Sequence, residues 1–280
     1  MNNLPSGSDA RTDSTPPGSH LVAERVVPTM GIHNFRDYGG YPVVGGGHVA
    51  WGRLFRSADH AQATAADLEI ISGLGFGTVI DLRGASERVK APCRRPPAFD
   101  ATIICSDGET TPAPHASAAA QAFDAASARR NMLDRYADVP FRPYLGEVYR
   151  RYFAALAATD RPSLVYCSAG KDRTGLLVAL LHHVLGVHWD DVMSDYLLTN
   201  TAGNPEERIA TLRLDLERRF GAPMTDEAVR IVSSVFPEFL QTSFDVITAR
   251  YGNVDRYLAE VLDVTAECRE ALVARLVVAG

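Results

Sequence analysis

One segment constrains the fold of this chain more than any other, because a short apolar run ends in a cysteine and a long apolar helix pattern soon follows. Residues 163–167 (SLVYC) are typical of a buried strand, and residues 174–185 (TGLLVALLHHVL) form an apolar helical pattern. A strand that passes through a short loop into a buried helix is half of a βαβ unit. This segment therefore predicts an α/β fold with a parallel sheet.

The loop between that strand and helix, Cys167–Arg173 (CSAGKDR), has the features of an oxyanion cradle. Its backbone amides can point at one tetrahedral anion, and the helix N-terminus adds partial positive charge. Gly170 permits a backbone conformation that a side chain blocks, and the guanidinium of Arg173 can bind two oxygens at once. The predicted phosphate-binding residues are Ser168, Ala169, Gly170, Lys171, Asp172 and Arg173.

The same loop predicts that Cys167 is a nucleophile, because helix N-termini and nearby cations stabilise a thiolate. A helix dipole alone contributes only about 0.3–2 kcal/mol, so several amides and Arg173 must act together. One alternative is an inert cysteine that only fills the core. Another is a nucleotide-binding P-loop, which requires Ser or Thr directly after the lysine, whereas Asp172 follows Lys171 here.

Other segments repeat the alternation of helix and strand. A capping box at Thr64–Asp67 (TAAD) opens a helix, Thr78–Leu82 (TVIDL) is predicted to be a buried strand, and residues 101–105 another. We therefore expect an α/β fold with a central, mostly parallel twisted sheet flanked by helices. The Ala-rich stretch 108–130 is predicted to be a surface excursion, and the chain after Asp190 to be helical.

Composition excludes several protein classes. The net charge of −6 gives no general attraction to nucleic acid, and the longest apolar run, Leu176–Leu181, is shorter than the roughly 20 residues that span a bilayer. The 4 cysteines include no CxxC pair, which argues against a disulfide scaffold and against structural zinc. Residues 1–21 lack the apolar core of a secretory signal. We expect a disordered tail over 1–21, one domain over 22–280, and a protein that is cytoplasmic or exported without a conventional signal peptide.

The segment Cys167–Gly175 (CSAGKDRTG) resembles the Cys-x5-Arg protein tyrosine phosphatases, and more narrowly the atypical bacterial branch typified by mycobacterial protein tyrosine phosphatase B. The resemblance covers about residues 22–280 and implies that family's fold, with a helical lid over 201–236. Four further motifs match in the family's usual order, namely Asn34–Gly40 (NFRDYGG), Leu54–Ser57 (LFRS), Val79–Arg83 (VIDLR) with Glu87, and Asp195–Asn200 (DYLLTN).

The resemblance implies hydrolysis of phosphotyrosine in proteins through a phosphocysteine on Cys167, without a metal or a cofactor. Arg173 would stabilise the equatorial oxygens, and Thr174 would bond to the sulfur and assist its departure. The resemblance also implies dual specificity, toward phosphoserine and phosphothreonine, and activity on phosphoinositides. The reason is that Lys171 adds a second cation at the floor of the pocket.

The general acid has three candidates. The atypical branch implicates the aspartate inside the loop, which is Asp172 here. Asp81, at the end of its strand, matches another acid associated with that family's site, unless it is a structural carboxylate that holds Arg83 or a loop amide. Other tyrosine phosphatases place the acid on an upstream loop, which suggests Asp138, unless that residue is simply solvated. We favour Asp172, then Asp81, then Asp138.

One departure from the family pattern is Tyr166, which replaces the histidine that usually precedes the cysteine and so removes an imidazole behind the loop. We expect Arg36 and Asp37 to form a structural ion pair or to hold the loop. Two other functions remain open at this point. They are a catalytically silent phosphate-binding module and a rhodanese-type sulfurtransferase, although the latter lacks the run Gly170–Gly175 (GKDRTG).

Overall fold

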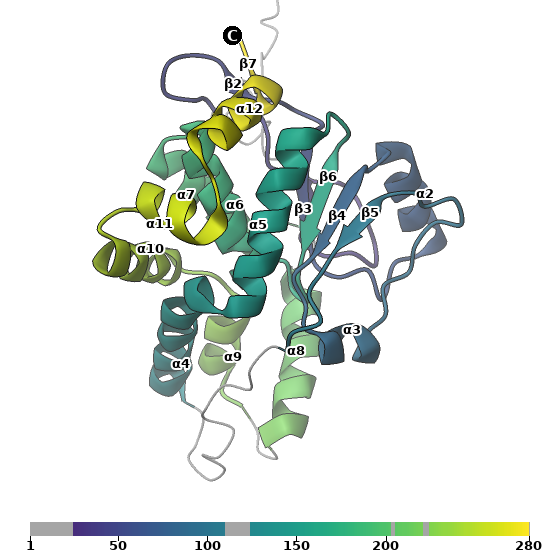
Figure 1. Cartoon of the computed structure of the whole chain (residues 1–280). Coiled ribbons are helices and arrows are strands. Elements are labelled where there is room, and N and C mark those ends of the chain that lie inside the picture. The colour runs from purple at the N-terminus through teal and green to yellow at the C-terminus, as the bar shows by residue number, and fades with distance from the viewer. Residues whose placement is uncertain (1–24, 110–123, 203–204, 221–223, 280) are drawn as a thin grey trace, which may run out of the picture.

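The computed structural model describes residues 25–109, 124–202, 205–220 and 224–279, which are the coloured parts of Figure 1. The predicted tail over 1–21 and part of the 108–130 stretch lie outside these residues. Among the described helices, none combines the length and the apolar character that crossing a bilayer requires.

A five-stranded sheet lies at the centre of the fold, with the strand order β1-β3-β6-β4-β5. Strand β1 pairs antiparallel with β3, and the other three pairings are parallel. The prediction of a mostly parallel sheet is confirmed. The strands are β1 (Arg36–Asp37), β3 (Leu54–Ser57), β4 (Thr78–Asp81), β5 (Thr102–Ile104) and β6 (Ser163–Tyr166).

Strand β6 occupies the middle of this sheet, and all four of its residues are buried. Successive side chains of a strand face opposite sides. Leu164 and Tyr166 therefore belong to the smaller core beneath helix α2 (Ala65–Leu74), whereas Val165 and Cys167 belong to the larger core. Because helices cover both faces, the buried residues Leu164, Val165 and Tyr166 do not alternate with exposed polar residues.

Helices from the second half of the chain cover the larger core. Helix α5 (Pro143–Ala158) crosses the front of the sheet in Figure 1, and α6 (Asp172–Leu185) is the buried helix that follows β6. The α/β prediction is therefore confirmed. The other helices on this side are α4 (Ala125–Asp138), α7 (Trp189–Leu197), α10 (Pro237–Tyr251), α11 (Val254–Leu262) and α12 (Ala266–Leu276), with short 3₁₀ turns at Val139–Phe141 and Leu198–Asn200.

Helix α2 begins where its capping box places it. The Thr64 hydroxyl accepts a hydrogen bond from the Asp67 amide, and the Asp67 carboxylate accepts one from the Thr64 amide. The same carboxylate also accepts from the amides of Met30 and Gly31, which ties the N-terminal segment to the helix. Gly75 ends α2 in the left-handed conformation.

Helix α4 is a correction to the sequence analysis, which predicted a surface excursion over 108–130. The helix starts at Ala125 and buries Ala128, Met132 and Tyr136 at successive turns. These residues pack toward α9 (Asp226–Ser233) and α10. Contacts with distant helices stabilise α4, so the Ala-rich local sequence gave no clear signal.

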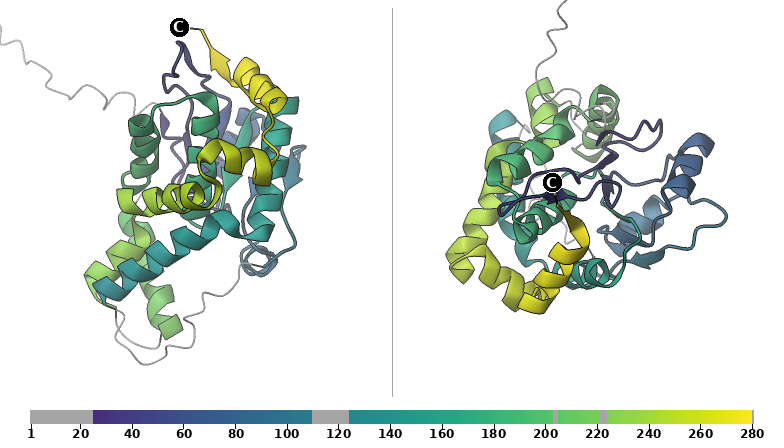
Figure 2. Two further views of the ribbon diagram at one scale, coloured as in Figure 1. Left: turned by 60° about the vertical axis from the view of Figure 1, so that its left-hand side comes forward. Right: turned by 90° about the horizontal axis from the view of Figure 1, so that it is seen from above.

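The C-terminus departs from the predicted helical ending. Helix α12 ends at Leu276, and β7 (Val277–Val278) pairs antiparallel with β2 (His48–Val49). Figure 2 shows this pair at the end of the molecule opposite to α8 (Pro205–Phe220) and α9. Helices α8 and α9 belong to the predicted lid segment and lie at the end of the sheet where β4 and β6 terminate (Figure 1).

Candidate active site

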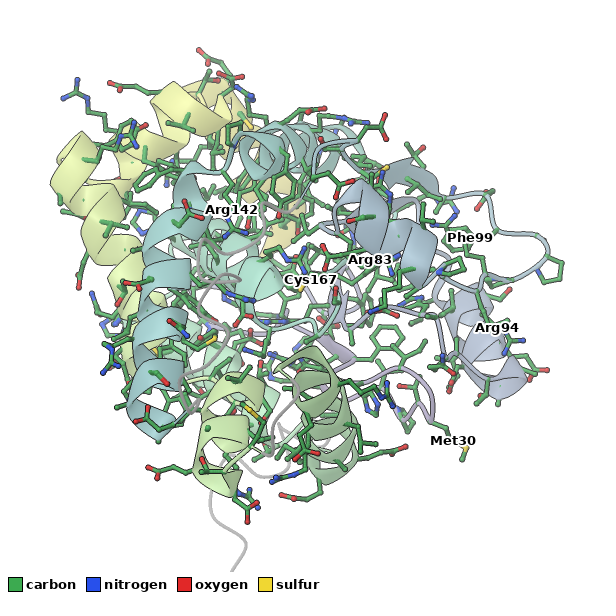
Figure 3. The ribbon with its side chains drawn as sticks, turned by 90° about the horizontal axis from the view of Figure 1, so that it is seen from below. Met30, Arg83, Arg94, Phe99, Arg142 and Cys167 are labelled. Carbon is green, nitrogen blue, oxygen red and sulfur yellow. The ribbon has the colours of Figure 1, made fainter. Side chains whose placement is uncertain are left out.

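The carboxyl end of β6 delivers Cys167 to the lower end of the molecule, near the centre of the view in Figure 3. The chain turns over residues 167–171, and α6 starts at Asp172. Gly170 has a φ of +65°, and a Cβ at this position would lie 2.2 Å from the carbonyl oxygen of Ser57. Only glycine combines this backbone conformation with such a close approach of two chain segments.

Cys167 is 3% exposed, and it interacts electrostatically with Arg173. Burial by itself would lower the pKa of the Arg173 guanidinium, but Cys167 and Glu87 hold it well above its ordinary value. Thr174, in the first turn of α6, has a buried hydroxyl with no hydrogen-bond partner among the described residues. An unpaired buried hydroxyl of this kind costs about 1–3 kcal/mol.

The Arg173 guanidinium is held in a fixed orientation by Glu87 on helix α3 (Ala85–Lys90). Nη1 of Arg173 donates to Oε2 of Glu87 at 2.7 Å, and Nη2 donates to Oε1 at 2.9 Å. Nη1 also donates to the Leu82 carbonyl at 3.0 Å, and Nη2 to the Ser168 hydroxyl at 3.3 Å. Two parallel bonds of this kind fix the plane of the guanidinium as well as its position.

Glu87 is in turn fixed by the start of its own helix. Its Oε2 accepts from the Gly84 amide at 2.9 Å, and its Oε1 accepts from the Ser168 hydroxyl at 2.6 Å. Burial would raise the pKa of this carboxyl, but the bonds and charge of Arg173 outweigh it and lower the pKa to about 2. Glu87 is therefore ionised throughout the physiological range.

Asp172 and Lys171 form an ion pair inside the loop. The Lys171 ammonium donates to Oδ1 of Asp172 at 2.7 Å, and the Tyr136 hydroxyl donates to the same oxygen at 2.6 Å. Arg135 lies 3.9 Å from Oδ2. Burial would raise the pKa of Asp172, but Lys171 and Arg135 outweigh it, and the pKa lies below its ordinary value. Before substrate binds, Asp172 is thus a carboxylate.

Lys171 also connects the loop to the predicted lid segment. Its Nζ lies 3.5 Å from the carbonyl oxygen of Ser234, the residue that follows α9. The Lys171 side chain is buried, so its charge lies inside the protein rather than in solvent. The second cation of the loop is therefore paired with the Asp172 carboxylate.

Asp81 lies in a buried ion pair with Arg83. Its Oδ1 accepts from Nε of Arg83 at 2.9 Å, and its Oδ2 accepts from Nη2 at 2.8 Å. The Tyr166 hydroxyl donates to Oδ2 as well, at 3.1 Å. Asp81 therefore holds Arg83, which is the structural role that the sequence analysis gave as the alternative to catalysis.

Tyr166 faces away from the loop, because it lies on the sheet face opposite to Cys167. Its ring stacks on the imidazole of His60 with the ring centroids 5.1 Å apart. Burial, with help from Arg83 and Arg95, lowers the pKa of His60 to about 3. The imidazole that stacks on Tyr166 is therefore neutral and belongs to the segment that follows β3.

Asp138 is the last residue of α4 rather than part of a loop. Its Oδ2 accepts from Nε of Arg142 at 2.6 Å, and its side chain is 59% exposed. Its contacts are those of a solvated surface ion pair.

Arg36 and Asp37 do not pair with each other, which corrects the ion pair considered from the sequence. Arg36 bonds to Asp195 at 3.2 Å, whereas the Asp37 carboxylate accepts from the amides of Gly39 and Gly52. Consecutive residues of a strand point to opposite faces. The two side chains therefore serve different parts of the structure.

Sequence reasoning missed the residues that support the loop from other elements. The Tyr149 hydroxyl donates to the Arg173 carbonyl at 2.9 Å, and the Tyr136 hydroxyl contacts Asp172. Glu87 was recognised only as part of a motif, without its role on Arg173. The spacing of Tyr149 in an apolar helical pattern indicates burial, but no local signal identifies the group that it contacts.

The arrangement combines a cysteine, a fixed guanidinium and a helix N-terminus at one end of a parallel sheet. Such a site favours nucleophilic attack on a tetrahedral anion whose charge the loop stabilises. Among the described residues, no three His, Cys, Asp or Glu side chains are grouped to hold a metal.

Comparison with known proteins agrees with this geometry. Residues 27–278 match the model of the tyrosine phosphatase family. A proposed tyrosine-protein phosphatase of Cupriavidus necator is 33% identical over 244 residues, which cover 83% of this chain and 82% of that protein. The triple specificity protein phosphatase PtpB of Mycobacterium tuberculosis is 30% identical over 269 residues, covering 85% of this chain and 94% of that protein. A tyrosine-protein phosphatase of Nostoc commune is 28% identical over 150 residues, covering 51% and 47% respectively.

Proposed function

Because this chain belongs to the tyrosine phosphatase family, we propose that it hydrolyses phosphotyrosine in proteins through a phosphocysteine on Cys167. The observation that carries this proposal is the pairing of Arg173 with Glu87 beside the cysteine loop. The guanidinium is oriented before substrate arrives, so no reorganisation is needed when charge develops on the phosphoryl group. Family membership gives no support to a silent binding module or to a rhodanese-type sulfurtransferase.

The first step transfers the phosphoryl group to sulfur. The Cys167 thiolate attacks phosphorus, a sulfur–phosphorus bond forms, and the bond from phosphorus to the tyrosine oxygen breaks in line. The loop amides of residues 168–173 and the Arg173 guanidinium stabilise the equatorial oxygens. The phenolic oxygen leaves with a proton from a general acid.

The second step regenerates the enzyme. Water attacks phosphorus, loses a proton to a base, and displaces the Cys167 thiolate, so that inorganic phosphate is released. Thr174 would donate a hydrogen bond to the sulfur as negative charge returns to it. The Thr174 hydroxyl is buried and has no hydrogen-bond partner among the described residues, so it is available to donate in this step.

We assign the acid to Asp172 in preference to Asp81 and Asp138. Both oxygens of Asp81 are engaged by Arg83, and Asp138 pairs with Arg142 at the surface. Asp172 lies inside the loop, and a phosphate dianion beside it would raise the pKa of its carboxyl by like-charge repulsion. Substrate binding would thereby help Asp172 to take up the proton that it later donates.

We extend the proposal to phosphoserine, phosphothreonine and phosphoinositide substrates. The support is the relative named a triple specificity protein phosphatase, together with Lys171 as a second cation in the loop. The pairing of Lys171 with Asp172 means that a second phosphate would have to compete for this ammonium. We further propose that residues 201–236 act as a lid, because Lys171 contacts Ser234 within that segment.

Phosphate release from p-nitrophenyl phosphate and from a phosphotyrosine peptide tests the proposed function. The wild type should release phosphate from both substrates, and Cys167→Ser should release none while still binding the peptide. A wild type that binds the peptide without releasing phosphate would contradict the proposal. Parallel assays with a phosphoserine peptide and a phosphoinositide decide the wider substrate range.

A further inference from the structure

We infer that Asn34, Arg36, Arg56 and Asp195 are positioning residues of the cysteine loop, which fix the Gly170 carbonyl so that the following peptide N–H faces the phosphate. The inference rests on the proposed function of the loop and adds residues that do not touch substrate. Arg36, Arg56 and Asp195 are called the arginine cluster below.

The Gly170 carbonyl accepts two hydrogen bonds from the side of the sheet. Nδ2 of Asn34 donates to it at 2.8 Å, and Nη2 of Arg56 donates to it at 3.0 Å. In a trans peptide the carbonyl and the next N–H point in opposite directions. Holding the Gly170 oxygen against the sheet therefore directs the Lys171 N–H away from the sheet, toward the concave side of the loop.

Bonds within the arginine cluster hold these two donors, the Asn34 amide and the Arg56 guanidinium, in place. Asp195 accepts from Nε of Arg36 at 3.2 Å through Oδ1 and from Nη1 of Arg56 at 2.6 Å through Oδ2. Arg36 in turn donates to Oδ1 of Asn34, which leaves Nδ2 of that amide directed at Gly170. All four side chains are buried. Their hydrogen bonds fix which end of the Asn34 amide faces the loop.

The cluster also places an excess positive charge behind the loop, since it contains two guanidinium groups and one carboxylate. Burial and the neighbouring Arg56 lower the pKa of Arg36 to about 10, so it stays charged at neutral pH. The pKa of Asp195 is below its ordinary value, because the two arginines outweigh its burial. Attraction by this charge acts on the phosphate in addition to the hydrogen bonds.

The groups that surround the cluster do not cancel this charge. Burial raises the pKa values of the neighbouring tyrosines and lowers that of the histidine, so these side chains are neutral, and the remaining arginine and aspartate offset each other. The surrounding titratable and charged groups are Arg25, Asp37, Tyr38, Tyr41, His182 and Tyr196.

Asn34 and Gly170, the two residues that this hydrogen bond joins, both have unusual backbone conformations. Asn34 has a φ of +58°, a conformation that few residues other than glycine adopt. Gly170 packs so closely on Ser57 and Ala58 that a Cβ would lie 2.2 Å from the Ser57 oxygen and 2.6 Å from the Ala58 nitrogen. Since strained conformations persist where the surrounding structure enforces them, this contact is a built feature of the loop.

The test compares variants of Asn34 and Arg56 by the inhibition constant of orthovanadate, by kcat and KM for p-nitrophenyl phosphate, and by thermal melting. Asn34→Asp can keep the backbone conformation and an acceptor for Arg36, but it replaces the donor to Gly170 with a carboxylate. We expect vanadate binding and kcat to fall about ten- to a hundredfold, with a smaller change in KM. Arg56→Lys, which keeps the charge, should lose less than Arg56→Gln.

Arg53→Gln is the matched control, because Arg53 precedes the same strand but pairs with Asp160 at 3.5 Å instead of the loop. It should leave vanadate binding unchanged. If Asn34→Asp does not fold, Asn34→Gly decides, since glycine accepts the backbone conformation and removes only the amide. Folded variants with wild-type vanadate binding would overturn the inference, whereas an inactive wild type would overturn the proposed function instead.

Discussion

Glu87 and Arg173 face each other through two parallel hydrogen bonds of 2.7 Å and 2.9 Å, although they lie 86 residues apart in the chain. The carboxylate belongs to helix α3 and the guanidinium to helix α6, so the pairing joins two elements that follow neighbouring strands. The guanidinium donates its further bonds to the Leu82 carbonyl and to the Ser168 hydroxyl.

Replacing Glu87 should impair catalysis without unfolding the protein. In Glu87→Gln the charge that orients Arg173 is lost, and we expect kcat/KM for p-nitrophenyl phosphate to fall about ten- to a hundredfold. Steady-state kinetics measure the loss. Glu260→Gln, which alters the exposed pair of Glu260 with Arg256, serves as the control and should match wild type. Unchanged kinetics in Glu87→Gln would show that Arg173 needs no orienting carboxylate.

The pH dependence of this loss follows from the carboxyl pKa. The pKa of Glu87 falls from 4.5 to about 2 on folding, so the pairing is complete above pH 4.5 and is lost only as the pH falls toward 2. The ratio of kcat/KM between wild type and Glu87→Gln should therefore be constant at every pH above 4.5. A ratio that changes with pH in that range would contradict the role of Glu87 as a carboxylate that only orients Arg173.

Asp172→Asn should slow turnover in a way that depends on the leaving group. A poor leaving group such as an alkoxide needs protonation as it departs, whereas p-nitrophenoxide does not. We expect a loss of about a hundredfold or more with an alkyl phosphate and a much smaller loss with p-nitrophenyl phosphate. Equal losses on both substrates would show that Asp172 is a structural residue, which acts through its hydrogen bonds with Lys171 and Tyr136.

Gly170→Ala should abolish activity through the geometry of the loop. The added methyl group would collide with the Ser57 carbonyl oxygen at 2.2 Å, and the φ of +65° disfavours any side chain. Gly73→Ala is the control, because Gly73 lies inside α2 with nothing within 4 Å of its added Cβ. It should keep full activity and raise the free energy of unfolding by up to about 1 kcal/mol. An active Gly170→Ala enzyme would argue against a tightly held loop.

The sequence predicts those parts of the site that one contiguous segment encodes. The strand, the glycine turn and the helix over 163–185 could be predicted because burial, backbone freedom and helix pattern all leave local signals. The parallel sheet follows from the same signals repeated at Thr78–Leu82. Capping chemistry placed the start of α2 at Thr64, because both partners of that cap lie within four residues.

The supporting contacts could not be predicted from local patterns. Asp195 lies 159 residues from Arg36 and 139 residues from Arg56, and only the folded chain brings the three side chains together. Helix α4 was missed in its first turns because its stability depends on packing against α9 and α10. Pairwise contacts between distant segments leave no periodic trace in a single sequence.

The most direct test of the central claim is to quench the enzyme during turnover of p-nitrophenyl phosphate and to locate the phosphoryl group by peptide mass spectrometry. The account predicts a phosphoryl group on Cys167 in the wild type, more of it in Thr174→Ala, and none in the inactive Cys167→Ser. A phosphoryl group on any other side chain, or sustained turnover by Cys167→Ser, would contradict it.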